Sequence, residues 1–180
     1  MITLHTPRLT LRPFTLDDAP AVQRLAGAYE VALNTLMIPH PYPDGAAADW
    51  ISSHEEDYRE NRIHHFAIDD GELCGAIALI LRDEGLAEIG YWLGVPYWNR
   101  GYVSEAAREV VRYGFEDIGL RRVFAGCFAR NPASARVMVK AGMKYEGTLR
   151  QHTLKWGEPQ DLTFYGILRD EWLSARRTAE

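Results

Sequence analysis

The sequence predicts an α/β protein of the α+β kind, with a mixed, mostly antiparallel twisted sheet of about seven strands and helices on both faces. Three observations lead to this prediction. Apolar or alternating segments bounded by turn signals predict strands, and three follow one another closely between residues 64 and 93. Segments with a 3.6-residue apolar period stand before and after them. One such segment separates two predicted strands, which requires a helical crossover and a parallel pair. The 180 residues are expected to form one domain, 1–180.

The first third of the chain predicts one strand and two helices. Residues 8–14 alternate polar and apolar side chains, which indicates a strand with one buried face. Thr15 to Asp18 then provide a helix cap with acids in the first turn, and the helix is expected to reach about Gly27. Three prolines mark residues 34–45 as a loop. A second amphipathic helix is expected over 46–60.

The middle of the chain predicts three antiparallel strands joined by short turns. They are expected at 64–68, 73–81 and 87–93, with turns at 69–72 and 83–85. The second strand is almost entirely apolar, which indicates that it is central in the sheet.

The second half predicts two helices that alternate with strands. An apolar stripe runs along residues 103–118 and ends at Gly119, which is a suitable terminator. A strand is expected at 121–128. Asn131 and Pro132 are typical of a helix start, and this helix is expected to end at Gly142. The last strands are expected at 143–150 and 161–169.

Composition narrows the classes of function. The chain is 47% hydrophobic and 25% charged, which is typical of a protein with a full core, and its net charge is −5. It has no basic cluster, so we expect no nucleic-acid partner. The longest apolar run, 76–81, is far too short to span a bilayer, and the N-terminus does not resemble a signal peptide, so we expect no membrane partner and a cytoplasmic location. Cys74 and Cys127 lie in apolar runs and are expected to be buried thiols; no metal spacing is present, so no metal is expected.

The stretch 95–108 organises the chain, because a strand there leads through a short turn directly into a helix. The first amides of a helix have no helical acceptor, and they form a ready phosphate site. Gly101 permits close approach to the backbone, Asn99 tolerates a left-handed conformation, and Arg100 can pair with phosphate. The dinucleotide and Walker patterns are absent. The alternative is an ordinary turn with a glycine at a tight position.

Residues 93–106 resemble the acetyl-CoA-binding segment of the GNAT acetyltransferases, and are closest to the RimJ/RimL-type branch. Three further segments, 8–14, 131–147 and 161–172, resemble other parts of that branch in the same order and spacing. The resemblance therefore covers nearly the whole chain. One position departs from it: the family usually has glycine where this chain has Asn99, so we expect weaker or slightly reshaped phosphate contacts.

The resemblance implies a GNAT-like fold in which the parallel strands splay apart and acetyl-CoA lies between them, with no metal. The arm of the cosubstrate would bond to backbone near Leu93 and Val95, and its pyrophosphate would lie on the amides of 100–104. The implied cofactor-binding residues are Leu93, Val95, Asn99, Arg100, Gly101, Tyr102, Val103, Ser104, Asn131 and Ser134.

Two residues are candidates for catalysis. The resemblance places Ser134 near the sulfur, and we interpret it as a hydrogen-bond donor to the developing thiolate; as an alternative, Ser134 and Asn131 simply cap a helix. Glu88 is the candidate general base, directly or through a water, and the alternative is a solvated carboxylate at a strand end. Asp161 and His152 are weaker candidates.

Several other side chains have less specific interpretations. His64 and His65 are adjacent in a strand, face opposite ways and are not expected to share a metal. Glu105 is expected to stabilise a helix start rather than to catalyse. The resemblance places the acceptor pocket at the loop 34–45 and the start of the following helix. Its candidate lining residues, which could instead belong to the core, are Tyr42, Trp50 and Tyr58.

These observations predict an acetyl-CoA-dependent N-acetyltransferase that works by direct attack of a primary amine, without a covalent enzyme intermediate. The amine could be a protein N-terminus or a small molecule. The alternative is a CoA-binding sensor or interaction module without turnover, against which Ser134 and Glu88 argue. The resembling family often forms homodimers, which makes a dimer a further expectation.

Overall fold

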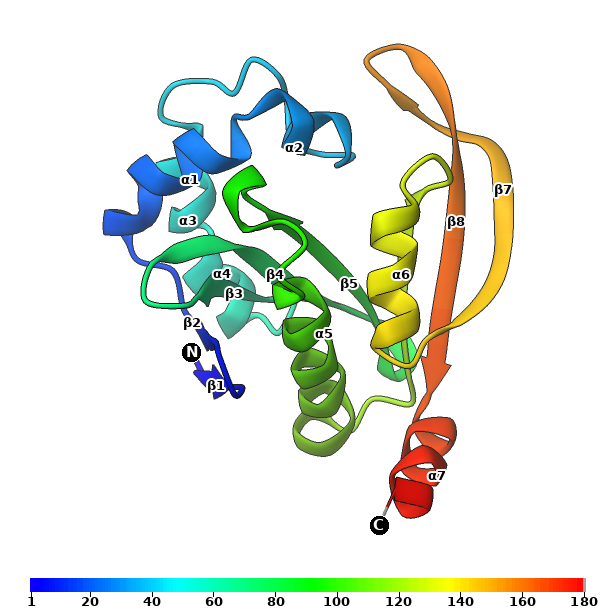
Figure 1. The fold of residues 1–180 in the computed structure, drawn as a ribbon. Coiled ribbons are helices and arrows are strands. Elements are labelled where there is room, and N and C mark those ends of the chain that lie inside the picture. Colours follow the sequence, from blue (N-terminus) through cyan, green and yellow to red (C-terminus); the bar gives the residue numbers. More distant parts are fainter. Residues whose placement is uncertain (180) are drawn as a thin grey trace.

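The structure is a computed structural model that describes residues 1–179, and its centre is an eight-stranded sheet in the order β1-β2-β3-β4-β5-β6-β8-β7 (Figure 1). All neighbouring strands are antiparallel except β5 and β6, which are parallel. This confirms the predicted mixed sheet. The strands are β1 Leu4–His5, β2 Thr10–Arg12, β3 Ile63–Asp69, β4 Leu73–Arg82, β5 Leu86–Leu93, β6 Arg122–Phe128, β7 Lys144–Lys155 and β8 Glu158–Leu168.

Helices cover both faces of the sheet (Figure 1). On one face α5 and α6 pack over the larger apolar cluster, which includes Ile77, Val110 and Met138. On the other face α1 and α3 pack over a smaller cluster around Val22 and Ile51. The helices are α1 Ala19–Ala26, α2 Tyr29–Leu33, α3 Ala46–Ser52, α4 His54–Arg59, α5 Tyr102–Tyr113, α6 Pro132–Lys140 and α7 Arg169–Ala179.

The structure differs from the prediction mainly at the ends of elements. The short strand β1 precedes β2 in a hairpin that Thr6 closes by donating from its amide to the Leu9 carbonyl at 2.9 Å. The helix expected over 46–60 breaks at Ser53 into α3 and α4. The helix α7 was not predicted, because its sequence is largely charged. It is held by Trp172, whose ring lies 5.6 Å from that of Phe115.

The period-two geometry of β3 separates its two histidines, as predicted. His64 shares a hydrogen bond of 2.9 Å with the Tyr113 hydroxyl of α5. His65 faces the other way, where its Nε2 lies 3.2 Å from the Asp57 carboxylate of α4. Among residues 1–179, no group of three or more His, Cys, Asp or Glu side chains is arranged to hold a metal ion. No helix in this part of the chain is long and apolar enough to cross a membrane. Cys74 and Cys127 are buried free thiols, as expected.

His54 is a buried histidine without a hydrogen-bond partner on either ring nitrogen among the described residues. Its ring stacks on that of His65 at 3.8 Å and meets Trp50 edge-on at 4.4 Å. Burial, together with the nearby His65, lowers the pKa of His54 to about 3. The pKa in the folded state is thus below that of the unfolded chain, about 6.5. As the pH falls, His54 is therefore protonated in the unfolded chain before it is protonated in the folded protein. The free energy of unfolding decreases for this reason between pH 6.5 and pH 3.

We expect His54→Leu to reduce the loss of stability in mild acid. Leucine fills a similar space and carries no group that must remain uncharged. Between pH 7.5 and pH 5, the wild-type protein should lose about 1–2 kcal/mol of unfolding free energy through this residue, and the variant should not. Urea unfolding at both pH values measures the difference, with the exposed His5→Leu as control. An equal loss in wild type and His54→Leu would contradict the assignment.

Candidate active site

The parallel strands β5 and β6 are joined only at their beginnings. Their register contains three residue pairs, the last of which is Glu88 with Phe124. Beyond it, β5 stays paired with β4 as far as Leu93, and β6 stays paired with β8 as far as Phe128. The two strands therefore diverge toward their carboxyl ends and leave a gap in the sheet, as the resemblance implied. Ligands of open α/β sheets bind at this kind of position.

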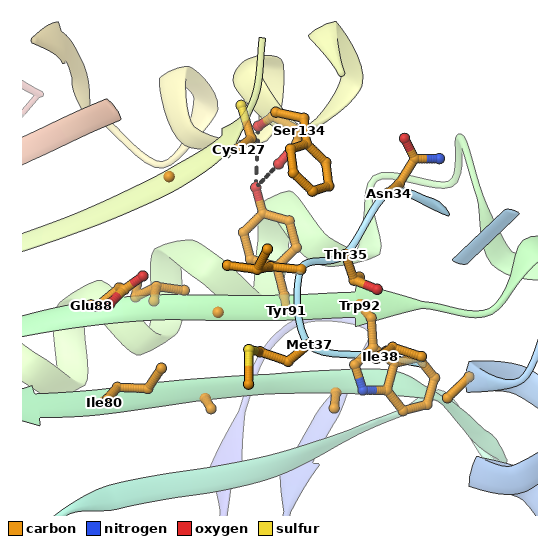
Figure 2. A pocket seen from close by; sticks show the side chains of 18 of the residues that line it. Asn34, Thr35, Met37, Ile38, Ile80, Glu88, Tyr91, Trp92, Cys127 and Ser134 are labelled. Carbon is orange, nitrogen blue, oxygen red and sulfur yellow. Dashed lines mark hydrogen bonds between the residues drawn. The ribbon is translucent and has the colours of Figure 1, made fainter. Parts of the chain in front are cut away.

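A cavity of about 750 Å³ occupies the gap and extends over one face of the sheet. This volume is in the range of pockets for small molecules. Its lining includes Glu88, Tyr91 and Trp92 from β5, and Cys127 from β6 (Figure 2). The loop that carries Asn34, Thr35, Met37 and Ile38 crosses the cavity (Figure 2).

Tyr91 and Ser134 form a hydroxyl pair at the gap. The Tyr91 hydroxyl lies 2.7 Å from Ser134 Oγ and 3.2 Å from the Ser134 carbonyl oxygen (Figure 2). Both residues line the cavity. Burial raises the pKa of Tyr91 above its ordinary value, although the bond to Ser134 opposes the shift. Tyr91 is therefore a neutral donor, and the pair can offer a hydroxyl proton to a group that enters the gap.

Tyr91 was not among the predicted site residues. It lies within the apolar alternating run of β5, where an aromatic side chain normally indicates core. Its partner Ser134 is 43 residues further along the chain, so no local spacing connects them. Cys127, which lines the same part of the cavity, was predicted only as a buried thiol, and burial raises its pKa.

Asn131 caps helix α6, which was the alternative to its predicted role in binding acetyl-CoA. Its Oδ1 accepts a hydrogen bond from the Ser134 amide at 3.1 Å, at the beginning of α6. Asn131 is not part of the cavity lining, whereas Ser134 is. The cap fixes the backbone of Ser134 and leaves its hydroxyl free to meet Tyr91.

Glu88 lies at the point where β5 and β6 separate, and it lines the cavity. Its Oε2 accepts a hydrogen bond from Arg82 at 2.9 Å. Its Oε1 has no partner among residues 1–179, and its side chain is 31% exposed, so it can receive a proton from the cavity. The position of Glu88 in the cavity fits a general base. Its ion pair with Arg82 also agrees with the alternative interpretation, a solvated carboxylate at a strand end.

The two weaker candidates have different surroundings. His152 lines the cavity, and its ring meets Phe164 at 6.0 Å. Asp161 does not line it; its Oδ1 instead accepts a bond from the Gln151 amide at 2.7 Å, which holds the β7–β8 hairpin.

The turn before α5 has the backbone expected of a phosphate site. Asn99 and Gly101 both adopt left-handed conformations, with φ of 62° and 80°. The first amide of α5 with an acceptor is that of Glu105, which donates to the Gly101 carbonyl at 3.1 Å. Among the described residues, the amides of 100–104 have no acceptor, and Asn99, Arg100 and Gly101 are exposed. Tyr102 is half-buried, and Val103 and Ser104 are buried beneath the turn. These open donors fit a diphosphate.

Side chains from the N-terminal segment hold this turn in place. Arg8 donates to the Arg100 carbonyl at 3.0 Å and forms an ion pair of 2.6 Å with Glu105. The Glu105 carboxylate also accepts a bond of 2.6 Å from Thr6. Burial acts to raise the pKa of Glu105, but these bonds lower it below its ordinary value overall. Glu105 thus connects the N-terminus to α5, in agreement with a structural role.

The backbone near the end of β5 is partly occupied. The Leu93 carbonyl accepts a hydrogen bond of 2.7 Å from the Trp98 indole. Val95 is exposed at the start of the next turn, and its amide has no acceptor among the described residues. The Val95 amide and the second lone pair of the Leu93 carbonyl oxygen are therefore open to a ligand in the gap.

The predicted acceptor residues divide into two groups. Tyr42 and Trp50 line the cavity, as proposed. Tyr58 does not line the cavity and agrees with the alternative of a packing role: its ring lies 4.6 Å from that of His64, which faces α5. The break at Ser53 places Tyr58 on the separate helix α4, beyond the helix that covers the pocket.

Comparison with known proteins identifies the class. The sequence profile of the acetyltransferase (GNAT) domain matches residues 8–144, so the chain belongs to the GNAT acetyltransferase family. It is 34% identical to the uncharacterized N-acetyltransferase YoaA of Bacillus subtilis (strain 168), over 92% of this chain and 96% of YoaA. The chain is accordingly an acetyltransferase enzyme, and acetyl-CoA is the cosubstrate of this family.

Solved structures agree with the fold. A GNAT-family acetyltransferase from Bacillus anthracis superposes with a TM-score of 0.83 at 26% identity, covering 94% of this chain and 99% of that one. RimL, a ribosomal L7/L12 alpha-N-protein acetyltransferase solved with coenzyme A, superposes with a TM-score of 0.85 at 19% identity, covering 94% and 99%. The predicted resemblance to the GNAT family is confirmed by the profile match, and the RimL structure shares the fold.

Proposed function

We propose that this protein transfers the acetyl group of acetyl-CoA to a primary amine by direct attack, using the gap between β5 and β6. The observation that carries the proposal is the alignment of three features along one path. Open amides of 100–104 lie at the start of α5, the strands separate after Glu88, and the Tyr91–Ser134 pair lies at the gap. The phosphate site, the thioester site and the acceptor cavity then follow one another.

The reaction requires one bond to form and one to break. The lone pair of a neutral amine attacks the thioester carbonyl, the new C–N bond forms, and the C–S bond breaks to release a thiolate. We assign Ser134, supported by Tyr91, to donate a hydrogen bond to the departing sulfur, where negative charge develops. The proton of the attacking nitrogen passes to Glu88, directly or through a water.

We expect Glu88→Gln to lower kcat by about 10²–10⁴-fold if this carboxylate is the base. If Glu88 only attracts the ammonium form of the substrate, KM rises and kcat stays within about threefold. Exposed Glu84→Gln, on the neighbouring turn, is the matched control.

The test of the function is transfer itself. Purified protein is mixed with acetyl-CoA and a panel of primary amines, and free thiol is measured together with the mass of the product. We expect acetylated amine to appear in proportion to released thiol. Tight binding of acetyl-CoA by calorimetry without transfer to any amine would instead support the CoA-binding sensor.

A further inference from the structure

The floor of the acceptor cavity is made of small residues. In the sheet register, Ala78 of β4 is directly opposite Gly90 of β5, and directly paired residues project to the same face. On β6, Gly126 lines the same cavity. Larger side chains at these three positions would fill the space, so the cavity exists because the sequence leaves it open.

The walls are apolar and largely aromatic. Trp50 comes from α3, Trp92 from β5, Phe124 and Phe128 from β6, and Phe164 from β8. These rings line the same cavity as the small floor residues and offer flat apolar surfaces to a ligand.

The described lining of the cavity has one carboxylate and no lysine or arginine, and its histidines are His65 and His152. Of the described residues that line it, Glu88 is the only Asp, Glu, Lys or Arg. Burial lowers the pKa of His65, which keeps that ring neutral, although Asp57 opposes the shift. A second ammonium group of a ligand would have no second carboxylate to meet in this lining, and a ligand carboxylate would have no lysine or arginine to meet. Unpaired charges of this kind are costly in an apolar site.

The loop over the cavity is fastened to β7, to a residue that follows β6 and to helix α1. Lys155 of β7 is buried, and it donates to the carbonyls of Ile38 at 2.8 Å and Leu36 at 3.3 Å. Arg130, which follows β6, donates to the Leu33 carbonyl at 2.7 Å, and Gln23 of α1 donates to the Pro43 carbonyl at 3.0 Å. A fastened loop limits the space to that of a small molecule and disfavours a protein chain.

We propose that the acceptor is a small apolar monoamine with a body of aromatic size, of the arylalkylamine kind. This rests on the proposed function, since it names the amine. The single carboxylate Glu88 meets the amino group, and the aromatic walls over Ala78, Gly90 and Gly126 hold the body.

Steady-state kinetics on the purified protein test the proposal. The amines are 2-phenylethylamine, phenylalanine, spermidine and a hexapeptide with a free N-terminus. We expect kcat/KM for 2-phenylethylamine to exceed each of the others by about 100-fold, because each of the others brings an unpaired polar or charged group. If phenylalanine, spermidine or the peptide is acetylated equally well or better, the inference fails while the function stands. If 2-phenylethylamine binds in the presence of CoA, as measured by calorimetry, and no amine is acetylated, the function fails while the cavity assignment stands.

A cavity-filling variant provides a second readout. Ala78→Leu should raise KM for 2-phenylethylamine about 10-fold or more and change KM for methylamine less than about twofold, with acetyl-CoA affinity unchanged. Ala78→Val replaces it if circular dichroism shows that the leucine variant is unfolded. Exposed Ala175→Leu on α7 is the matched control. Equal effects on both amines would contradict the placement of the aromatic body.

Discussion

Gly101→Val is expected to weaken acetyl-CoA binding by at least about 100-fold while the protein remains folded. Gly101 has φ of 80° immediately before α5. Valine is β-branched and strongly disfavours this conformation, at about 1–2 kcal/mol. To relieve the strain, the turn must rotate, and the amides of 100–104 then no longer converge. A side chain here would also stand on the surface that the diphosphate must approach, next to Arg8, which lies 3.5 Å from the expected Cβ position.

Gly119→Val is the matched control for this result. Gly119 has φ of 81°, and no atom lies within 4 Å of the position of its Cβ, so valine there brings the same backbone strain. It follows α5 at the opposite end from the turn. Both variants should therefore lose similar thermal stability, and only Gly101→Val should lose acetyl-CoA affinity in calorimetry. Unchanged affinity in Gly101→Val would remove this turn from the site.

Ser134→Ala is expected to lower kcat by about 10²–10³-fold and to change acetyl-CoA affinity less than about threefold. A donor to the departing sulfur acts where charge develops in the transition state, so its loss affects turnover more than binding. The substitution preserves the helix cap, because Asn131 accepts from the Ser134 amide and not from its hydroxyl. Ser52→Ala is the control, since that exposed hydroxyl bonds only within its own helix.

Tyr91→Phe completes this test. The Tyr91 hydroxyl orients Ser134 Oγ across 2.7 Å, so the two groups should act as a unit. We expect the double variant to be little worse than Ser134→Ala alone, which is the signature of coupled residues. Equal losses of turnover and of acetyl-CoA affinity in the single variants would assign the pair to structure alone.

Most of the fold could be predicted because strand and helix periods are local. The run of β4, the stripe of α5 and the cap at Asn131 each show their element within a dozen residues. The residues at which helices and strands begin and end could be predicted less well from the sequence. The helix α7 is held by contacts with residues far away in the sequence, namely the ring of Phe115 against Trp172 and the ion pairs Arg176–Glu116 and Lys144–Glu171.

The candidate site could be predicted only in part. The turn before α5 is contiguous in sequence, so its open amides and glycine were visible there. The Tyr91–Ser134 pair joins a strand to a distant helix, and the cavity floor joins β4, β5 and β6, so both depend on register across the sheet. Tyr58 lies outside the cavity because α3 ends before Ser53 and the separate helix α4 carries Tyr58, and nothing in the amphipathic pattern marks that break.

The most direct measurement is the structure of the complex with coenzyme A. We expect density for the diphosphate on the amides of 100–104, for the arm between β5 and β6, and for the sulfur beside Ser134. Coenzyme A bound elsewhere, with the turn before α5 closed by neighbouring side chains, would contradict this expectation.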